Sequence, residues 1–378
     1  MTTIVVGAGV MGLATAWHLA RADEAVTLLE RGPIPNPLAA SWDSHRLIRA
    51  LYPGSPGYTR MAIDAFAAWD EVWQAAGVSH YANCGSIAFS RAEGDWTDGC
   101  RAPLDALGAA YELVPPEELA RRYPFLIPDG IRWGLFMPEG GVLFADRILS
   151  TLVDLCRAAG VALRPQAPVR AVDPDGTVTL ESGEVLQADS VVVAAGAWVG
   201  GLFPDVIGKR LNPYRQVVVY LDPPAEVAEA WARAPGIIDC GFPDAHWGIP
   251  PVGGTRLKLA VGDWKRRAEP GLDPAVGAGE AEAIRERWRP VLRDIDRYAI
   301  LEARSCRYIF APDDRFVLER RGRAWLVSPC SGHGFKFGAL IGRAVADGVR
   351  GRRGPDELAS WAAGHLPAGH LAAEGERA

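Results

Sequence analysis

The sequence lacks the features that mark several specialised classes of protein. No apolar stretch reaches the ~20 residues that span a bilayer, and no basic run offers a surface for nucleic acid. The chain starts on an apolar strand pattern without a basic leader, and it ends without a lipidation or peroxisomal signal. Its six cysteines show neither CxxC nor zinc-like spacing, which predicts no disulfide framework and no metal site. We therefore expect a cytoplasmic protein with no membrane or nucleic-acid partner.

The composition that remains is that of an ordinary globular protein. The 378 residues are 49% hydrophobic and 23% charged, and 40 Lys and Arg against 46 Asp and Glu give a net charge of −6. At about 100–200 residues per domain, this length predicts two or three domains, or two interwoven ones.

The first thirty residues have the pattern of a βαβ unit. We expect a strand at Thr3–Val6, a helix at Val10–Arg21 and a second strand at Ala25–Leu29. A loop rich in Pro and Ala follows at Gly32–Ala40, and a helix is expected at Pro56–Ala76.

Two kinds of pattern alternate in the rest of the chain. Unbroken apolar runs predict buried parallel strands at Ser190–Trp198 and Ala324–Val327, and a glycine-rich turn after the second run opens a helix at Ala339–Val349. Segments of another character lie before and between these runs: antiparallel strands at Cys84–Ser90, Gly130–Phe136 and Arg215–Leu221, a helix at Asp146–Ala159, and a small meander at Ala167–Val172 and Gly176–Leu180.

The nucleotide-fold patterns thus occur at the start, in the middle and near the end of the chain. We predict a mixed α/β (α+β) fold in which a Rossmann-like cofactor domain is interleaved with an antiparallel-sheet substrate domain. The expected division assigns residues 1–80, 140–210 and 300–378 to the cofactor domain, and 81–139 and 211–299 to the substrate domain.

A dinucleotide-binding motif lies between the first strand and the first helix. The run Gly7-Ala8-Gly9-Val10-Met11-Gly12 is a GxGxxG, with glycines for a tight turn, for approach to a pyrophosphate and for close helix packing. The helix N-terminus offers free N–H groups to phosphates. Glu30 ends the second strand, where a carboxylate can accept hydrogen bonds from a ribose diol and disfavours NADP. The motif alone does not separate FAD from NAD.

Several short motifs in the same order along the chain resemble those of one flavoprotein family. They are the GxGxxG, Gly196-Ala197-Trp198, Ser331-Gly332-His333-Gly334-Phe335-Lys336-Phe337, and the segments at 44–49, 140–143, 213–216, 257–259 and 306–308. Together they resemble the D-amino-acid-oxidase-type flavoproteins, and most of all the sarcosine oxidases, N-methyltryptophan oxidases and pipecolate-type oxidases. The resemblance implies FAD as the cofactor and oxidation of a C–N bond.

The resemblance also implies how the flavin is held. Cys306 matches the cysteine that bonds covalently to the flavin 8α-methyl group, and flanking Arg304 and Arg307 would lower the pKa of its thiol. Cys330 is the competing cysteine, which we interpret as a packing residue. The implied cofactor set further contains Arg31, Val169, Gly196 and Trp198, and the late turn of Gly332, His333, Gly334, Phe335 and Lys336. His333 is either a hydrogen-bond donor there or a conformational residue, with equal weight.

Two arginines and a late lysine are expected at the reacting end. The resemblance places Arg46 against the flavin face, and pairs Arg49 with Lys336 as a clamp on the substrate carboxylate. The spacing of three puts both arginines on one face if their segment is helical. The alternative is two solvated arginines on a loop.

The match at Lys258 implies oxygen activation, whereas the bland alternative is a strand lysine that faces solvent. Tyr308 matches the resembling oxidases, but Gly262 stands where they carry a histidine and Trp247 where they carry a tyrosine. The flavin chemistry is therefore expected to be kept and the amine pocket altered.

We predict an FAD-dependent oxidase of a secondary-amine or cyclic amino acid, which forms an imine and reduces dioxygen to hydrogen peroxide. Its expected partners are the amino acid and dioxygen, and a monomer is favoured. The alternatives are a flavin amino-acid dehydrogenase that passes electrons to a carrier, and a non-catalytic flavin-binding subunit.

Overall fold

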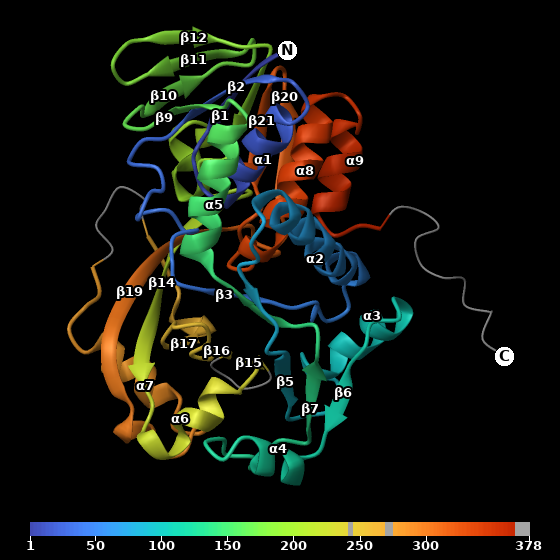
Figure 1. The fold of residues 1–378 in the computed structure, drawn as a ribbon, viewed down its shortest axis with the longest axis vertical. Coiled ribbons are helices and arrows are strands. Elements are labelled where there is room, and N and C mark those ends of the chain that lie inside the picture. Colours follow the sequence, from blue (N-terminus) through green and yellow to red (C-terminus); the bar gives the residue numbers. More distant parts are fainter. Residues whose placement is uncertain (241–244, 269–274, 367–378) are drawn as a thin grey trace, which may run out of the picture.

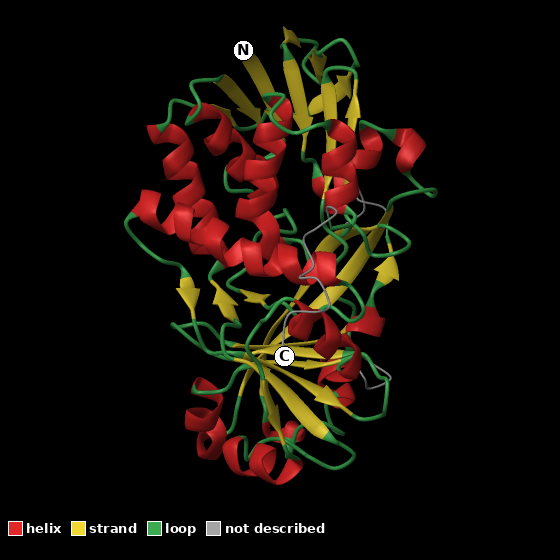
Figure 2. Cartoon of the chain, turned by 90° about the vertical axis from the view of Figure 1, so that its right-hand side faces the viewer, coloured by secondary structure: helices red, strands yellow, loops and turns green. Residues whose placement is uncertain are grey.

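The structure, a computed structural model, describes residues 1–240, 245–268 and 275–366. Figure 1 shows two halves along the longest axis, one built on a parallel sheet with helices and one on a broad antiparallel sheet. Figure 2 shows the long helices gathered in the first half and the antiparallel strands fanning out in the second. The predicted mixed fold with a Rossmann-like part and an antiparallel part is confirmed.

The parallel half contains a six-stranded sheet in the order β20-β21-β13-β1-β2-β9. Every pairing in it is parallel except that of β20 with β21. The strands are β1 (Thr2–Val6), β2 (Ala25–Leu29), β9 (Ala162–Arg164), β13 (Ser190–Val193), β20 (Val317–Arg321) and β21 (Ala324–Ser328). Strands from distant parts of the chain therefore form one sheet, as the sequence patterns predict.

The centre of this sheet explains its apolar sequence. Val191, Val192 and Val193 of β13 are fully buried, because β13 lies between β1 and β21 and side chains cover both faces. The expected strand at Ser190–Trp198 is too long, since β13 ends at Val193 and a 3-10 helix occupies Gly196–Gly201. The extended backbone has already ended at Ala195, whose ψ is 6°, and Gly196 then begins the 3-10 helix with a φ of +53°.

The helices of the parallel half pack closely on one another. They are α1 (Val10–Ala20), α2 (Pro56–Ala76), α5 (Ala145–Ala158), α8 (Gly338–Val349) and α9 (Pro355–Ala362). Helix α8 crosses α1 where glycine permits contact: a Cβ at Gly338 would lie 2.4 Å from Val10 Cγ2, and one at Gly342 would lie 2.5 Å from Ala14 Cβ. The late glycines thus hold the last long helix against the first helix of the βαβ unit.

The antiparallel half contains a nine-stranded sheet in the order β18-β14-β17-β16-β15-β5-β7-β6, with β19 also paired to β14. Its strands are β5 (Ser86–Ser90), β6 (Glu112–Val114), β7 (Trp133–Met137), β14 (Asn212–Asp222), β15 (Gly236–Asp239), β16 (His246–Ile249), β17 (Leu257–Val261), β18 (Arg266–Arg267) and β19 (Ala299–Phe310). Short helices lie beside it: α3 (Arg101–Ala106), α4 (Pro116–Arg122), α6 (Ala225–Ala232) and α7 (Glu280–Arg287).

One strand crosses the expected domain division. That division assigns residues 300–378 to the cofactor domain, whereas β19 pairs with β14 from Asn212–Phe310 to Asp222–Ala299 and so lies in the antiparallel sheet. The division also runs to residue 378, and residues 367–378 lie outside the described residues.

A small sheet lies between the two halves (Figure 1). It consists of β3 (Arg46–Ile48), β8 (Gly141–Leu143) and β4 (Tyr81–Ala82), in the order β3-β8-β4. The condition under which Arg46 and Arg49 would share a helical face is not met, because Arg46 begins a strand and Arg49 follows it. Strand β3 pairs with β8 in antiparallel orientation, with Leu47 opposite Val142 and Ile48 opposite Gly141. This pairing places Arg46 and Arg49 between the parallel sheet and the antiparallel sheet.

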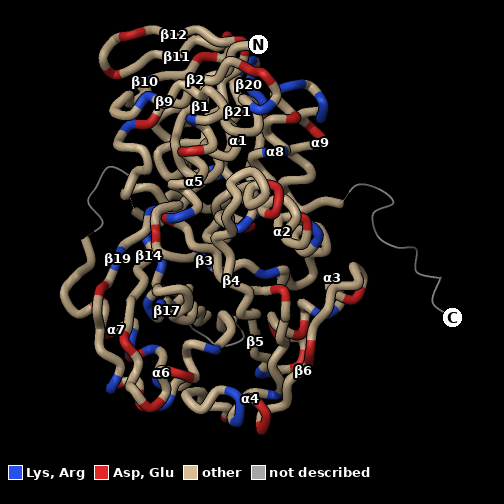
Figure 3. The backbone as a smooth tube through the Cα atoms, viewed as in Figure 1, with Lys and Arg blue, Asp and Glu red and all other residues tan. Residues whose placement is uncertain are grey.

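The outer surface carries the predicted meander, β10 (Val169–Val172), β11 (Thr177–Leu180) and β12 (Val185–Gln187), as an antiparallel three-stranded sheet. Acidic and basic residues are interspersed over both halves (Figure 3). Within the described part of the chain, no helix has the length and apolar character to cross a membrane.

Candidate active site

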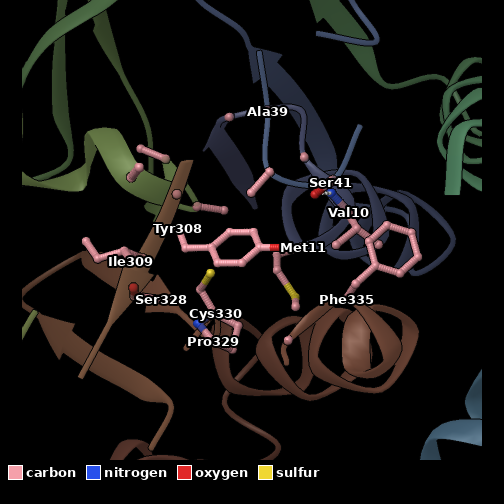
Figure 4. Close-up of a pocket in the computed structure, with 18 of the residues that line it drawn as sticks. Val10, Met11, Ala39, Ser41, Tyr308, Ile309, Ser328, Pro329, Cys330 and Phe335 are labelled. Atoms are coloured by element: carbon pink, nitrogen blue, oxygen red, sulfur yellow. Dashed lines mark hydrogen bonds between the residues drawn. The ribbon is translucent and has the colours of Figure 1, made fainter. Parts of the chain in front are cut away.

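A cavity of about 510 Å³ opens at the carboxyl ends of the parallel strands and reaches the antiparallel sheet. Crevices at this edge of an open parallel sheet are the usual place for a ligand. Its wall includes most of the residues singled out from the sequence: Gly7, Gly9, Val10, Met11, Glu30, Arg31, Arg46, Arg49, Val169, Gly196, Trp198, Trp247, Tyr308, Gly332, His333, Gly334, Phe335 and Lys336. Figure 4 shows part of this wall, with Tyr308 reaching in from β19.

Four of the expected site residues do not form part of this wall. Gly12 lies behind it, where a Cβ would stand 1.9 Å from the carbonyl oxygen of Gly7, in keeping with its expected packing role. Lys258, Gly262 and Cys306 are also absent from the lining, although Cys330 is part of it.

The nucleotide end of the cavity is shaped by backbone that only glycine permits. Gly7 has a φ of +103°, and a Cβ there would lie 2.5 Å from the carbonyl oxygen of Ala194. The first N–H of helix α1, on Val10, donates to the hydroxyl of Ser41 at 3.1 Å, as seen beside the labelled residues of Figure 4. Ser41 lies just after the Pro/Ala loop and was not recognised from the sequence, because only the fold brings it to α1.

Glu30 organises this end of the cavity. Its carboxylate accepts hydrogen bonds from the Ala8 N–H at 2.8 Å, the Asn36 amide at 2.8 Å and the Gly32 N–H at 3.1 Å. A carboxylate has about four lone-pair positions, so one remains for a ribose hydroxyl. Further along the wall, the hydroxyl of Ser328 is buried without a partner among the described residues. The glycine cradle, the acidic strand end and this orphan hydroxyl fit a bound dinucleotide.

At the opposite end, two cations flank the ring of Tyr52. Arg49 Cζ lies 5.2 Å and Lys336 Nζ 5.4 Å from the ring centroid. Lys336 is only 4% exposed, and burial, together with the nearby Arg49, holds its pKa well below the usual range. Its ammonium donates to the Tyr52 hydroxyl and to the His333 carbonyl, both at 2.9 Å. Among the described residues, the third N–H of Lys336 has no acceptor.

The hydrogen bonds of His333 fix its role. Nε2 lies 3.0 Å from the carbonyl oxygen of Asp314, which can only accept, so Nε2 carries the proton. Nδ1 then accepts from the Tyr52 hydroxyl at 3.1 Å, and burial, followed by Lys336, lowers the pKa of His333 to about 3. Both ring nitrogens are engaged within the protein, which favours the conformational role of His333 over a donor role toward a ligand.

A second buried cluster centres on Asp43, a residue that the sequence analysis did not single out. Both Arg46 Nη1 and Lys258 Nζ donate to its Oδ2, and the Tyr220 hydroxyl donates to its Oδ1. Arg46 also donates to the Ala40 carbonyl at 2.7 Å. The i, i+3 spacing of Asp43 and Arg46 was the one available sequence signal. Lys258 is 1% exposed, so the solvent-facing alternative for this lysine is wrong.

Opposing effects set the charges of this cluster. Burial acts to raise the pKa of Asp43, but Arg46 and Lys258 outweigh it and hold the pKa well below its usual range. Burial and Arg46 lower the pKa of Lys258 to about 8, although Asp43 opposes them. The ion pair is therefore charged at neutral pH.

The two candidate cysteines occupy different positions. Cys306 is buried on β19 and shares a face of that strand with Tyr308, two residues on. Burial raises the pKa of its thiol and outweighs Arg46, Lys258 and Arg304, so the net shift of this pKa is upward, although flanking Arg304 lowers it, as expected. Cys330 lines the cavity near Tyr308 (Figure 4), and burial also raises the pKa of its thiol.

Of the two residues expected to differ from those of the resembling oxidases, Trp247 lines the cavity and Gly262 does not. Trp247, on β16, lines the cavity, and its ring centroid lies 5.9 Å from Lys258 Nζ. Gly262 begins a 3-10 helix just after β17, and its N–H donates to the Ala245 carbonyl at 2.9 Å. Residues 1–240, 245–268 and 275–366 contain no group of three or more His, Cys, Asp or Glu side chains that could hold a metal ion.

Comparison with known proteins identifies the family to which this fold and cavity belong. Residues 2–348 match the family described as FAD dependent oxidoreductase. The chain belongs to this family. The resemblance seen in the sequence motifs is thus confirmed, and the protein is an FAD-dependent oxidoreductase.

Several relatives of this FAD-dependent oxidoreductase span almost its whole length. Human peroxisomal sarcosine oxidase is 28% identical over 355 residues, which cover 90% of each chain. Monomeric sarcosine oxidase of Streptomyces avermitilis is 25% identical over 363 residues, covering 91% of this chain and 92% of the relative. Among solved structures, L-proline dehydrogenase from P. horikoshii has a TM-score of 0.82 at 17% identity and covers 96% of both chains, a likeness of fold.

Proposed function

We propose that this FAD-dependent oxidoreductase oxidises the C–N bond of a secondary-amine or cyclic amino acid and passes the electrons to dioxygen. The observation that carries the proposal is the pair of cations, Arg49 and Lys336, in the wall of the cavity that the dinucleotide would enter. The names of the sarcosine oxidases that it resembles support the same reaction class.

The two cations form a receptor for a carboxylate. Burying Lys336 is costly, because its charge is desolvated and lies near Arg49. An anion that enters between them would offset that cost and would accept the third N–H of Lys336. The guanidinium of Arg49, placed over Tyr52 and over Trp96 at 5.1 Å, supplies further donors. An amino acid bound by its carboxylate would then direct its amine toward Trp247 and Tyr308.

Bound FAD would supply a two-electron acceptor for the hydride equivalent on the carbon next to the amine nitrogen. Water would then hydrolyse the imine, giving a carbonyl compound and an amine from an open-chain substrate, or one ring-opened amino-carbonyl compound from a cyclic substrate. The protein binds the amine in its neutral form, so no strong base is required. Burial raises the pKa of Tyr308 well above its usual range, which keeps the phenol protonated. Tyr308 therefore orients the substrate as a hydrogen-bonding group.

The aromatic wall favours a substrate with more bulk than sarcosine. Trp247 presents a broad apolar face to the cavity, where the resembling oxidases have a phenol, and Gly262 provides no imidazole nearby. An apolar methylene contributes about 1–3 kcal/mol to discrimination, so the preference is graded. Substrates of the proline, pipecolate or N-alkyl aromatic kind fit this pocket best.

The electrons go to dioxygen in this proposal because a buried cation stands near the reacting end. Lys258 carries a positive charge at neutral pH behind Arg46 and Trp247, and such a charge stabilises the negative charge that develops on dioxygen. The competing function is a dehydrogenase that delivers electrons to a carrier, and a purely cofactor-binding subunit is the third possibility.

For the covalent attachment of FAD we propose Cys306. Its place on the same face of β19 as Tyr308, among Arg46 and Lys258, supports this choice, while the cavity-lining Cys330 is the alternative. We further propose that the protein is cytoplasmic and acts as a monomer. Size-exclusion chromatography with light scattering would test the monomeric state.

The test of the function is a panel of amino acids assayed for hydrogen peroxide. Proline and pipecolate are compared with prolinol and 2-piperidinemethanol, which lack the carboxylate. We expect peroxide from the amino acids and at least about tenfold lower kcat/KM for the alcohols. Equal rates with the alcohols would contradict the carboxylate receptor. Turnover only with an artificial electron acceptor would identify a dehydrogenase.

A further inference from the structure

The carboxylate of Asp43 is completely buried and gathers donors from three separate parts of the chain. Lys258 of β17 and Arg46 of β3 donate to one oxygen, and Tyr220 of β14 donates to the other. The backbone N–H of the next residue, Ser44, also donates to Oδ1 at 2.8 Å. A buried carboxylate with four donors is held in one position and in its charged form.

We infer that Asp43 is the positioning residue that keeps Lys258 charged and fixed behind the reacting end of the cavity. The effect on reaction with dioxygen rests on the proposed function, whereas the effect of Asp43 on Lys258 does not. The loop of Trp42, Asp43 and Ser44 precedes β3, so the small central sheet brings the carboxylate to the antiparallel sheet that carries Lys258.

The hydrogen bonds of Lys258 show what Asp43 achieves. The ammonium donates to Asp43 Oδ2 and to the His45 carbonyl at 3.1 Å. Its third N–H has no acceptor in the described part of the chain, and the rings of Tyr220 and Trp247 lie 5.7 and 5.9 Å from Nζ. The two hydrogen bonds of Lys258 thus leave one N–H of its ammonium available for a ligand. Lys336 has the same arrangement, with two hydrogen bonds and one remaining N–H.

Asp43 is also the carboxylate that balances an otherwise unfavourable group of charges. Arg46 lies on the same oxygen as Lys258, and burial together with Arg46 favours the neutral amine. His45, whose pKa burial lowers to about 3, contributes no charge. The groups that face Lys258 are Asp43, His45 and Arg46 from the loop and β3, Tyr220 from β14 and Cys306 from β19, with Arg256, Glu302 and Arg304 at the edge of the cluster.

The proposed oxidase depends on this balance through the charge of Lys258. If a cation at this place stabilises charge on dioxygen, the oxidative half-reaction should slow as pH rises through the pKa of Lys258. Without the Asp43 carboxylate, the same loss should occur at lower pH. A purely structural ion pair would change stability but would leave the shape of this pH profile unchanged.

The experiment takes advantage of the small number of lysines, which are Lys209, Lys258, Lys265 and Lys336. In the holoenzyme labelled with [ε-13C]lysine, each lysine gives one signal whose shift reports its protonation, and Lys258→Met assigns the relevant one. We expect Asp43→Asn to lower the pKa of Lys258 by about 1–3 pH units, as loss of an adjacent opposite charge does. An unchanged pKa would overturn the inference.

Three further samples guard against trivial outcomes. Asp43→Glu should restore most of the shift. Asp239→Asn, which removes another fully buried carboxylate, paired with Arg91 at 2.7 Å, should leave the Lys258 signal unchanged. If Asp43→Asn does not fold, the wild type still decides, because a Lys258 that is neutral at pH 7 would contradict the inference.

Stopped-flow reoxidation by dioxygen between pH 6 and 9 then separates this inference from the proposed function. At pH 8, Asp43→Asn should reoxidise at least about fivefold more slowly than the wild type. At pH 6 the ratio should fall to about 1.1-fold for a pKa shift of one unit and about tenfold for a shift of three units. A lowered Lys258 pKa with an unchanged pH profile would uphold the role of Asp43 and refute oxygen activation by Lys258. A changed profile with an unchanged pKa would refute the role of Asp43.

Discussion

Substitution of Lys336 by methionine should weaken catalysis while changing the stability of the fold little. Lys336 is 4% exposed, and its ammonium has two protein acceptors, the Tyr52 hydroxyl and the His333 carbonyl. Methionine keeps most of the apolar stem and removes the charge. Tyr52 keeps its own hydrogen bond to His333 Nδ1. The substitution therefore removes a cation that is costly to bury in the absence of substrate.

The size of each effect follows from these contacts. A hydrogen bond between the ammonium and a substrate carboxylate contributes about 1.5–3 kcal/mol, which at about 1.4 kcal/mol per tenfold predicts a loss of roughly 10- to 150-fold in kcat/KM. For stability, removing a buried charge is worth about 1–4 kcal/mol and losing two hydrogen bonds costs about 0.5–1.5 kcal/mol each. These two ranges overlap and nearly cancel, so the free energy of unfolding should change by no more than about 3 kcal/mol in either direction.

The sign of the pH dependence provides an independent check. The pKa of Lys336 is lowered in the folded protein from its usual 10.5, so the unfolded chain binds more protons between the two values. Wild-type stability gains from this group as pH rises toward 10.5, and the gain is absent in Lys336→Met. The stability of the variant relative to the wild type should therefore fall as pH rises from 7 to 10.

The assays are denaturant unfolding across this pH range and steady-state kinetics with the best amino acid of the panel. Lys209→Met, at an exposed position, is the matched control and should change neither quantity. A variant that loses stability by several kcal/mol together with activity would show that Lys336 is a structural cation, and the carboxylate receptor would then be refuted.

Three further predictions concern the rest of the site. Lys258→Met should slow reoxidation by dioxygen at least tenfold, which is about 1.4 kcal/mol of barrier, and should slow anaerobic reduction much less. Equal slowing of both half-reactions would show that Lys258 has a positioning role, and Lys265→Met, at an exposed position, is the control. Cys306→Ala should release the yellow cofactor on acid precipitation, whereas release by Cys330→Ala alone would identify the wrong choice of cysteine. In the kinetic panel, pipecolate, proline and N-methyl aromatic amino acids should have higher kcat/KM than sarcosine; sarcosine as best substrate would refute the pocket argument.

The sequence predicts those parts of the fold that local patterns determine. The GxGxxG of the first βαβ unit, the apolar run of β13 and the glycine-rich approach to α8 each specify an element within a few residues, and the parallel sheet assembles from them. Strand ends are less well predicted, because the chain passes from β13 into a 3-10 helix without any change in hydrophobicity.

The polar clusters of the site depend on contacts that no local pattern contains. Asp43 meets Lys258 across 215 positions in the chain, and Tyr52 meets Lys336 across 284. A buried ion pair of this kind depends on the contact between the loop before β3 and the sheet that carries β14 and β17, so the sequence shows only an aspartate in a loop. The sequence likewise does not show the burial of Cys306, which raises the pKa of its thiol and outweighs the adjacent Arg304.

The small number of lysines in the sequence is a further indication of where the site lies. The chain has only four lysines, and two of them, Lys258 and Lys336, are among its most buried charged side chains. A buried lysine costs free energy unless its environment or a ligand repays it. Both lie on the reacting side of the cavity, where each keeps one N–H without an acceptor in the described residues.

The most direct test of the proposed function is anaerobic reduction of the purified yellow protein by an amino acid. Pipecolate or proline is mixed with the protein in the absence of oxygen, and the flavin absorbance is followed before and after dioxygen is admitted. The account predicts bleaching within the turnover time and full return of colour with one hydrogen peroxide per flavin. A flavin that no amino acid of the panel bleaches would contradict it.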